Sequence, residues 1–284
     1  MIYYKNFDLT NFNSYRIHST AKEVYFPENE KDIVDLYSQN NNYILLGSGH
    51  NIILASEYYE RPIVIFNGNF NEISLKDSNL IEIEAGAMMH DVADFALKHS
   101  LSGIEIFYDI PSSLGGAVVM NAGASGEEIK DVLVKVRYLD LADLQIKEIL
   151  KEDMSFEYRN SFFQRNTDKI VLKAWIKLTL SKPDLIKEKM ETIKAQRWAK
   201  QPKELPNGGS VFKRPKGYYV GAIIDELKLK GFTIGGAKVS EKHGGFIVNF
   251  NNAKGNDIVE IINHINSLVS MKYGFMLEIE QRII

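Results

Sequence analysis

Two glycine-rich segments constrain this chain more than any other feature. The first, LLGSGHN, spans residues 45–51 and follows an apolar stretch. The second runs from Pro111 to Gly126 and reads PSSLGGAVVMNAGASG. Because glycine has no Cβ, backbone N–H groups can approach a ligand closely and point at it. Segments of this kind are typical of phosphate binding.

The residues missing from these segments narrow the class of ligand. Neither contains the lysine that grips phosphate in a P-loop. The first also lacks the third glycine of a dinucleotide fingerprint, and no acidic residue stands at the spacing of a ribose contact. A pyrophosphate held mainly by backbone amides is therefore expected, which favours a dinucleotide such as FAD over ATP. Taken alone, the first segment could also be only a tight turn, whereas the second is more specific.

Composition excludes several classes of protein. The 284 residues carry a net charge of -3, which argues against a nucleic-acid partner. The absence of cysteine rules out disulfides and thiolate metal sites, and the six histidines show no metal-site spacing, so no metal is expected. No apolar run approaches the roughly 20 residues of a membrane helix. We therefore expect a cytoplasmic protein, with no membrane association, and we predict no protein partner.

Hydrophobic periodicity predicts a mixture of helices and strands, typical of an α+β chain. The predicted helices are one capped by Asn29, one over Asp91–His99 closed by Gly103, a charged one after Pro183, and one from the cap Asn256 to Gly274. The predicted strands cover residues 43–46, 61–66, 80–84, 132–139, 170–180 and the alternating segment 277–283. Turn-forming residues before Pro183 place a domain boundary near residue 182.

Taken together, the motifs resemble the UDP-N-acetylenolpyruvoylglucosamine reductase family, flavoenzymes that make UDP-N-acetylmuramate for peptidoglycan synthesis. The resemblance covers nearly the whole chain, in the same order: NSYR, LLGSGHNIIL, IPSSLGGAVVMNAGASG, YRNSFF, PNGGSVFKRP, GGAKVSEKHGGFIVN and LEIEQRII. No stretch is inserted after YRNSFF, which is similar to the shorter form of the family.

The resemblance implies a fold, a cofactor and a reaction. Residues 1–182 would form an FAD-binding domain of the vanillyl-alcohol-oxidase type, with two α+β subdomains over about 1–66 and 67–182. Residues 183–284 would form a smaller α+β substrate-binding domain. FAD would be bound non-covalently, NADPH would be the co-substrate, and the substrate would be a UDP-sugar carrying an enolpyruvyl group. Hydride would pass from NADPH to flavin N5 and then to the substrate.

The resemblance also implies residue roles. The FAD-binding residues would be Gly47, Ser48, Gly49, His50, Asn51, Pro111, Ser113, Gly115, Gly116, Ala117, Asn121, Ala122 and Gly123. Arg159 and Glu280 would stabilise the enolate that forms on the substrate, and Ser210 would donate the proton. Tyr158, Asn207, Lys213 and Lys238 would bind the substrate.

Each catalytic residue taken by itself has a simpler interpretation. Ser210 could be a turn hydroxyl, Arg159 a solvated surface group and Glu280 an exposed strand charge. Two other functions also stay open: another flavin oxidoreductase or oxidase on the same scaffold, and a non-catalytic flavin-binding module. The intact set of three residues favours the reductase, because an oxidase has no need of the proton donor.

His50 departs from the family, which prefers a small hydroxyl residue at this place in the loop. Some related flavin oxidases attach FAD covalently through a histidine in a similar loop. We expect instead that His50 forms a hydrogen bond to the pyrophosphate. Acid precipitation of the purified protein should then leave a colourless pellet and a yellow supernatant, whereas a yellow pellet would establish a covalent link.

Overall fold

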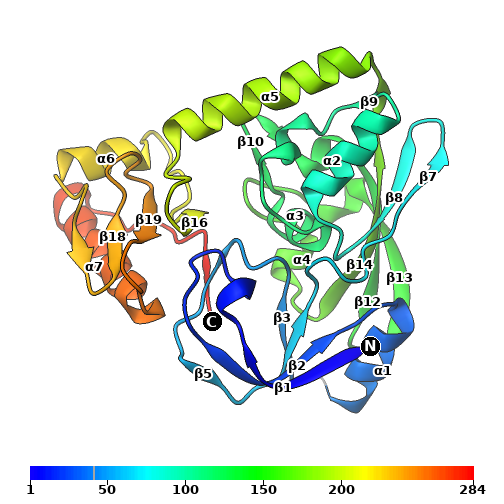
Figure 1. The fold of residues 1–284 in the computed structure, drawn as a ribbon, viewed down its shortest axis with the longest axis horizontal. Helices are drawn as coiled ribbons and strands as arrows, with labels where there is room; N and C mark the ends of the chain where they lie inside the picture. Colours follow the sequence, from blue (N-terminus) through cyan, green and yellow to red (C-terminus); the bar gives the residue numbers. More distant parts are fainter. Residues whose placement is uncertain (41) are drawn as a thin grey trace. The chain divides into compact units, whose positions relative to one another are not determined.

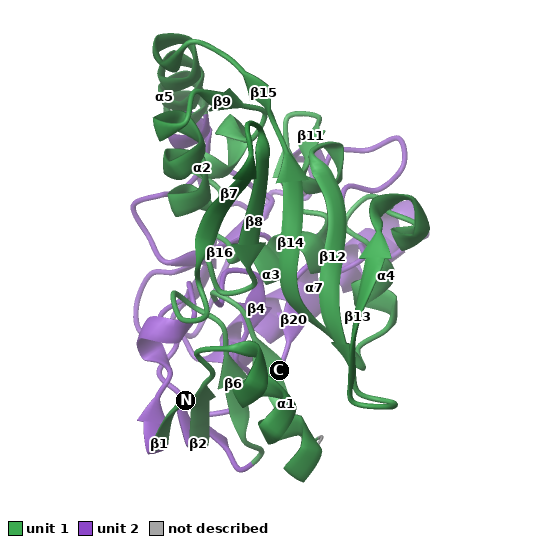
Figure 2. Ribbon diagram, turned by 90° about the vertical axis from the view of Figure 1, so that its right-hand side faces the viewer, with its two compact units in different colours: residues 1–4, 23–48, 61–196 green, residues 5–22, 49–60, 197–284 purple. Residues whose placement is uncertain are grey.

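The computed structural model describes residues 1–40 and 42–284 (Figure 1). These residues form two compact units, each assembled from separate stretches of the chain (Figure 2). Unit 1 comprises residues 1–4, 23–48 and 61–196, and unit 2 comprises residues 5–22, 49–60 and 197–284. The chain passes from one unit to the other within β1 (Ile2–Asp8), β2 (Thr20–Phe26) and α5 (Pro183–Lys200).

A five-stranded antiparallel sheet dominates unit 1. Its strand order is β13-β12-β14-β8-β7, with the bounds β7 Ile73–Asp77, β8 Leu80–Glu84, β12 Leu133–Asp140, β13 Gln145–Leu150 and β14 Lys169–Lys177. Alternation places Ile81 and Ile83 in the core and directs Glu82 and Glu84 away from it. The core side packs against α3 (Leu114–Met120) and α4 (Phe162–Arg165).

A second, five-stranded sheet contains three strands of unit 1 that run parallel to one another. β6 (Ile63–Ile65) lies between β2 and β3 (Ile44–Leu46), and β1 lies on the outer side of β2. Parallel strands require a crossover connection, and α1 (Glu30–Gln39) supplies it between β2 and β3. The predicted cap of α1 is confirmed, because the Asn29 side chain accepts a hydrogen bond from the Asp32 amide at 2.9 Å.

The remaining elements of unit 1 are short, apart from one helix. They are α2 Met89–Lys98, the strands β9 Leu101–Ser102, β10 Gly123–Ala124, β11 Glu127–Glu128 and β15 Thr179–Leu180, and the 3-10 helices η2 Glu105–Tyr108, η3 Ile129–Asp131 and η4 Lys151–Met154.

The carboxylate of Glu105, almost fully buried, pairs with Lys189 of α5 at 3.1 Å. Burial opposes ionisation of Glu105, but hydrogen bonds from Ser102 and Lys189 bring its pKa below the ordinary value.

Unit 2 contains a four-stranded antiparallel sheet of order β16-β19-β18-β17. Its strands are β16 Asn207–Ser210, β17 Thr233–Ile234, β18 Ala237–Val239 and β19 Phe246–Asn249, and its other elements are η1 Thr10–Phe12, β4 Ile52–Ile53, β5 Tyr58–Tyr59, α6 Val220–Glu226, α7 Gly255–Tyr273 and β20 Arg282–Ile283. The helix α7 packs on β17 and β18 through the predicted apolar face, which includes Ile258, Ile262 and Val269. The α+β class predicted from the sequence is confirmed.

Several predicted boundaries were wrong for local reasons. Gly103 does not end α2; the left-handed residue is Ser100 (φ 59°), and Gly103 follows β9. Asn256 does not cap α7, because Lys254 is the N-cap and its amide donates to the Asp257 carboxylate at 2.9 Å. Gly274 (φ 75°) ends this helix as predicted.

The two predicted strands nearest the domain boundary and the C-terminus also differ from expectation. The strand predicted over residues 170–180 divides into β14, which ends at Lys177, and β15, which pairs with β9. At the C-terminus only Arg282 and Ile283 form a strand, β20, which lies parallel to β4. Ile283 is 44% exposed, so the predicted apolar alternation fails at its last position.

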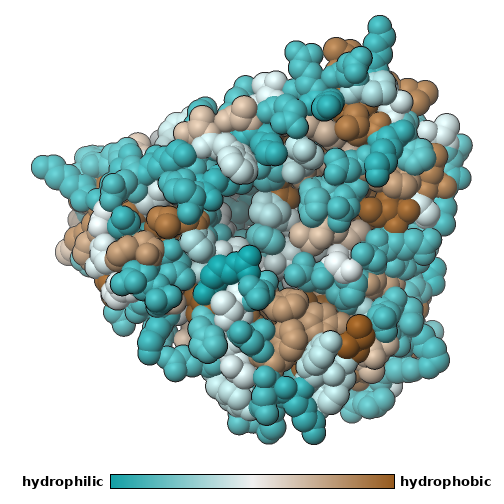
Figure 3. Space-filling view, viewed as in Figure 1, coloured by the Kyte–Doolittle hydropathy of each residue, from teal (hydrophilic) through white to brown (hydrophobic). Residues whose placement is uncertain are grey.

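Among residues 1–40 and 42–284, none of the helices combines the length and the hydrophobicity that a membrane span requires. The face shown in Figure 3 is largely hydrophilic, and its hydrophobic residues lie in separate small patches.

Candidate functional site

The first glycine segment forms a tight loop after β3. None of the described residues accepts a hydrogen bond from the amide N–H of Gly47, Ser48 or Gly49. Gly49 is buried and left-handed (φ 72°), and a Cβ there would lie 2.0 Å from the carbonyl oxygen of Phe12. Glycine is therefore required at this position. The unpaired amides are available to an anionic ligand.

The second glycine segment is not the continuous loop that its composition predicts. Residues Leu114–Met120 form α3, and the Ser113 hydroxyl caps it by accepting from the Gly116 amide at 3.4 Å. The physical reason is tertiary packing, because Leu114 and Val118 are fully buried in the core. Gly115 allows the helix to approach β8 closely, since a Cβ there would lie only 3.3 Å from the Cβ of Ala85.

Most amides of the second segment are already engaged within unit 1. The Leu114 amide donates to the Ala87 carbonyl at 2.8 Å, and the Gly115 amide donates to the Ala85 carbonyl at 2.9 Å. The Ala117 amide closes the first turn of α3 on the Ser113 carbonyl at 2.9 Å. These three amides of the second segment are therefore not free to bind a ligand, in contrast to the amides of Gly47, Ser48 and Gly49.

The structure brings the two segments together although they are far apart in the sequence. The Ser113 amide donates to the Ser48 hydroxyl at 3.1 Å. A Cβ on Gly47 would lie 2.6 Å from the Ser113 hydroxyl, so glycine permits this contact. Gly47, Ser48 and the start of α3 therefore form one packed group within unit 1.

Sequence reasoning did not single out two serines with buried hydroxyls, Ser112 in unit 1 and Ser14 in unit 2. Among the described residues, no hydrogen-bond partner is present for the buried hydroxyls of Ser112 and Ser14. A buried polar atom without a partner is costly, unless a ligand or water satisfies it. Both residues lie in quoted motifs, IPSSLGG and NSYR, but only their burial distinguishes them from ordinary turn serines.

Arg159 is positioned by the end of the second segment. Its guanidinium donates to the carbonyl oxygens of Gly123 at 2.7 Å and Asn121 at 3.4 Å. Asn121 ends α3 in the left-handed conformation (φ 44°), and its buried side chain donates to Glu128 and to the carbonyl of Glu157, each at 2.9 Å. The guanidinium also stands 5.0 Å from the ring centre of Tyr158, whose side chain is exposed. The simple interpretation of Arg159 as a solvated surface group is therefore wrong.

Ser210 and Glu280 lie on neighbouring backbone segments of unit 2. The Glu280 amide donates to the carbonyl of Val211, the residue after Ser210, at 2.8 Å. The Glu280 carbonyl accepts from the Asn51 side chain at 3.1 Å, so the first glycine loop reaches the same place. Ser210 is exposed at the end of β16, and Glu280 is half-buried. Arg159 belongs to unit 1, so the three predicted catalytic residues do not share one unit.

Two buried side chains, Tyr15 and Gln281, hold the backbone around Ser210 in place. The side chain of Gln281 donates to the Gly208 carbonyl at 2.8 Å and accepts from the Tyr15 hydroxyl at 2.9 Å. Burial raises the pKa of Tyr15 above its ordinary value, so this hydroxyl stays protonated and remains a donor. The sequence alone predicts no site role for either residue, because the two lie 266 positions apart in the chain.

The remaining substrate-binding candidates in unit 2 are held by local contacts. The Asn207 amide group donates to the carbonyls of Pro202 at 3.0 Å and Leu205 at 2.8 Å, which shapes the turn before Ser210. Lys213 pairs with Glu278 at 2.5 Å and Lys238 pairs with Glu241 at 3.2 Å. Both acidic partners are exposed, so these ion pairs are weak and can exchange for a ligand anion.

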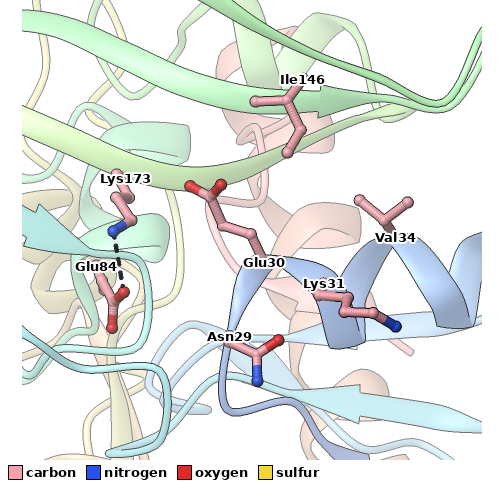
Figure 4. A pocket seen from close by; sticks show the side chains of 7 residues that line it. All are labelled: Asn29, Glu30, Lys31, Val34, Glu84, Ile146 and Lys173. Carbon is pink, nitrogen blue, oxygen red and sulfur yellow. Dashed lines mark ion pairs between the residues drawn. The ribbon is translucent and has the colours of Figure 1, made fainter.

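A separate groove of about 720 Å³ lies in unit 1, beside the start of α1 (Figure 4). It is lined by Asn29, Glu30, Lys31, Val34, Glu84, Ile146 and Lys173. Its charges already have partners, since Lys173 pairs with Glu84 at 3.1 Å and Arg137 pairs with Glu30 at 3.0 Å. None of the predicted site residues lines this groove, so it is not the candidate site.

Comparison with known proteins first defines a class. Residues 21–149 match a family model described as an FAD binding domain. This match agrees with the amides of Gly47, Ser48 and Gly49, for which none of the described residues provides an acceptor. Fold and site together define an FAD-binding oxidoreductase.

The particular family follows from the rest of the chain. Residues 201–284 match the model of the UDP-N-acetylenolpyruvoylglucosamine reductase C-terminal domain. The reductase of that name from Francisella tularensis is 41% identical over 97% of this chain and 98% of its own length, and that from Caldanaerobacter subterraneus is 39% identical over 99% and 93%. The crystal structure of the Thermus caldophilus reductase superposes with a TM-score of 0.83 at 28% identity, covering 99% of this chain and 98% of that one. The chain belongs to the UDP-N-acetylenolpyruvoylglucosamine reductase family, which confirms the resemblance and the predicted fold.

The Gly49 contact leads to a prediction about cofactor retention. Gly49→Ala should lower the free energy of unfolding by more than about 2 kcal/mol, because the new Cβ meets a backbone carbonyl that cannot move aside. The variant should also retain less FAD, measured as flavin absorbance relative to protein absorbance after gel filtration. Gly126→Ala is the matched control, since Gly126 is also left-handed (φ 91°) but has no atom within 4 Å of the new Cβ. Gly126→Ala should lower the free energy of unfolding by about 1 kcal/mol, and the variant should keep its flavin. Equal effects in both variants would contradict the steric argument.

Proposed function

We propose that this chain is the FAD-dependent reductase that converts UDP-N-acetylglucosamine enolpyruvate to UDP-N-acetylmuramate, with NADPH as the reductant. The observation that carries the proposal is membership of the reductase family over nearly the whole length of the chain. The presence of Arg159, Ser210 and Glu280 at the family's motif positions supports it. A cytoplasmic location stays a prediction.

The residues present fit FAD as the cofactor. The amides of Gly47, Ser48 and Gly49 and the buried Ser112 hydroxyl would hold its pyrophosphate. His50 and Asn51 would complete this group from the first segment, and Asn121, Ala122 and Gly123 would lie nearer the flavin. Binding would be non-covalent. When bound, FAD supplies hydride transfer at its N5 atom.

Arg159 as a cation and Glu280 as a hydrogen-bond donor would stabilise the negative charge that develops on the substrate. Hydride addition to the enolpyruvyl methylene carbon leaves negative charge on the adjacent carbon and its carboxylate. A preorganised guanidinium lowers the free energy of such a transition state most effectively. The two carbonyl contacts of Arg159 support this role, because they orient its guanidinium before substrate binds.

Ser210 would deliver the proton that completes the reduction. A serine hydroxyl is a weak acid in water, so it can protonate carbon only when the acceptor is a strong base in a dry site. An enolate is such a base. The contacts of Gln281 with the backbone of residues 208–210 support the role, because they hold the serine's backbone in one conformation.

Substrate recognition would fall to Tyr158, Asn207, Lys213 and Lys238. The two lysines are suited to phosphate or carboxylate, and their exposed acidic partners are easily displaced. We also propose that residues 1–182 act as the FAD-binding domain, with subdomains over about 1–66 and 67–182, and that residues 183–284 act as the substrate-binding domain. The family-model matches to residues 21–149 and 201–284 are consistent with this division.

Steady-state turnover tests the proposal directly. Purified protein loaded with FAD should oxidise NADPH rapidly only when UDP-N-acetylglucosamine enolpyruvate is present. Oxidation at the same rate without the sugar nucleotide would indicate an oxidase instead. Binding of FAD with no turnover under either condition would indicate a non-catalytic flavin-binding module.

Separate half-reactions test the role of Ser210. Ser210→Ala should leave flavin reduction by NADPH within about twofold of the wild-type rate, because no proton donor is needed in that step. Flavin reoxidation by the enolpyruvyl substrate should fall by at least about 100-fold. Ser38→Ala, on the exposed side of α1, serves as the control and should change neither rate. Equal losses in both half-reactions of Ser210→Ala would contradict the assigned role.

A further inference from the structure

We propose that Glu128 is a positioning residue, which holds the guanidinium of Arg159 in the orientation that the reaction requires. The inference rests on the proposed role of Arg159 and deepens it. Glu128 lies in β11, outside every glycine segment and motif that pointed to the function. Its assignment comes from contacts in the folded chain.

The carboxylate of Glu128 is largely buried, and the donor groups around it belong to Asn121, Lys130 and Arg159. Its side chain is 16% exposed. One oxygen accepts from the Asn121 side chain at 2.9 Å and pairs with Lys130 at 2.5 Å, and the other lies 3.8 Å from a guanidinium nitrogen of Arg159. At such low exposure the attraction between carboxylate and guanidinium is screened less by solvent than at the surface.

The hairpin that carries Glu128 also provides the other contacts of the guanidinium. Glu128 pairs with Gly123 across the β10–β11 hairpin. The Gly123 carbonyl is the acceptor at 2.7 Å from Arg159, so one hairpin supplies both a carbonyl and a carboxylate to the same group. A Cβ on Gly123 would lie 2.1 Å from the Glu127 carbonyl, which shows how closely the two hairpin strands are packed.

Local capping fixes Glu128 itself. Its amide donates to the Asp131 carboxylate at 2.8 Å, in a capping box at the start of η3. The Asn121 side chain, which donates to the Glu128 carboxylate, is fully buried and also donates to the Glu157 carbonyl at 2.9 Å. The carboxylate therefore has little freedom to follow the arginine, and its fixed charge adds to the two carbonyl contacts that orient the guanidinium.

The neighbouring carboxylate provides a matched comparison. Glu127 precedes Glu128 in the same strand, but it pairs with Lys189 of α5 at 3.0 Å, and its side chain is 42% exposed. Removing the charge of Glu127 therefore perturbs the same hairpin without removing the carboxylate that faces Arg159. A difference between the two variants isolates the contact with the guanidinium from the general stability of the hairpin.

The test compares half-reactions of the FAD-loaded enzyme by rapid mixing. Glu128→Gln keeps an acceptor for Asn121 but removes the charge that faces Arg159. We expect flavin reduction by NADPH within about twofold of wild type, and reoxidation by the enolpyruvyl substrate slower by about 10- to 100-fold, since a small misplacement of a catalytic group has a cost of this order. The substrate KM should change less than kcat, because the guanidinium keeps its charge. Glu127→Gln should leave both half-reactions unchanged.

A double-mutant comparison shows whether Glu128 acts through Arg159. In an Arg159→Lys background, which is itself slow in reoxidation, Glu128→Gln should add little further loss. Losses that multiply would show an independent role and would overturn the proposal. Melting temperatures of all variants are measured alongside. If Glu128→Gln does not fold, Glu128→Asp retains the charge on a shorter side chain, and its smaller loss should again be confined to reoxidation.

The remaining outcomes separate this proposal from the one on which it rests. A wild-type flavin that is not reoxidised by the enolpyruvyl substrate overturns the proposed function, and the role of Glu128 with it. Wild-type turnover combined with normal reoxidation in Glu128→Gln overturns the positioning role alone. Equal losses in both half-reactions of Glu128→Gln or Glu128→Asp would also overturn it, because they would indicate a structural defect.

Discussion

Close backbone packing between the two glycine segments is the constraint on which the rest of unit 1 depends. Gly47 leaves room for the Ser113 hydroxyl, and the Ser48 hydroxyl accepts from the Ser113 amide at 3.1 Å. This contact joins the parallel strands of unit 1 to the start of α3, which in turn rests on the antiparallel sheet. A side chain at Gly47 would displace the Ser113 hydroxyl, which caps α3 by accepting from the Gly116 amide at 3.4 Å.

The polar groups of the site have two different tasks. The amides of Gly47, Ser48 and Gly49 have no acceptor among the described residues, so they are suited to a ligand. Around Arg159 the polar groups satisfy one another instead, through two carbonyls and the carboxylate of Glu128. Unpaired donors favour binding of an anion, whereas a paired guanidinium is preorganised for a transition state.

Elements with strong local signals could be predicted from the sequence alone. The helix α1 has an N-cap with a short-range hydrogen bond, and α7 has an apolar face and a terminal glycine. The helix α3 could not be predicted, because Gly115 and Gly116 have low helix propensity and the helix is stabilised by packing against Ala85 and the core. Ser100 at the end of α2 could not be predicted either, since serine rarely adopts the left-handed conformation.

The sequence by itself determined the fold class, the family and the residues proposed for catalysis, because these depend on residue types in a fixed order along the chain. Only the tertiary structure decided which of those residues are held by others. The contact of Glu128 with Arg159, the link between Tyr15 and Gln281, and the unpaired hydroxyl of Ser112 depend on distances between residues far apart in the chain or on burial. Such distances follow from how the layers pack, and no local pattern of residues encodes them.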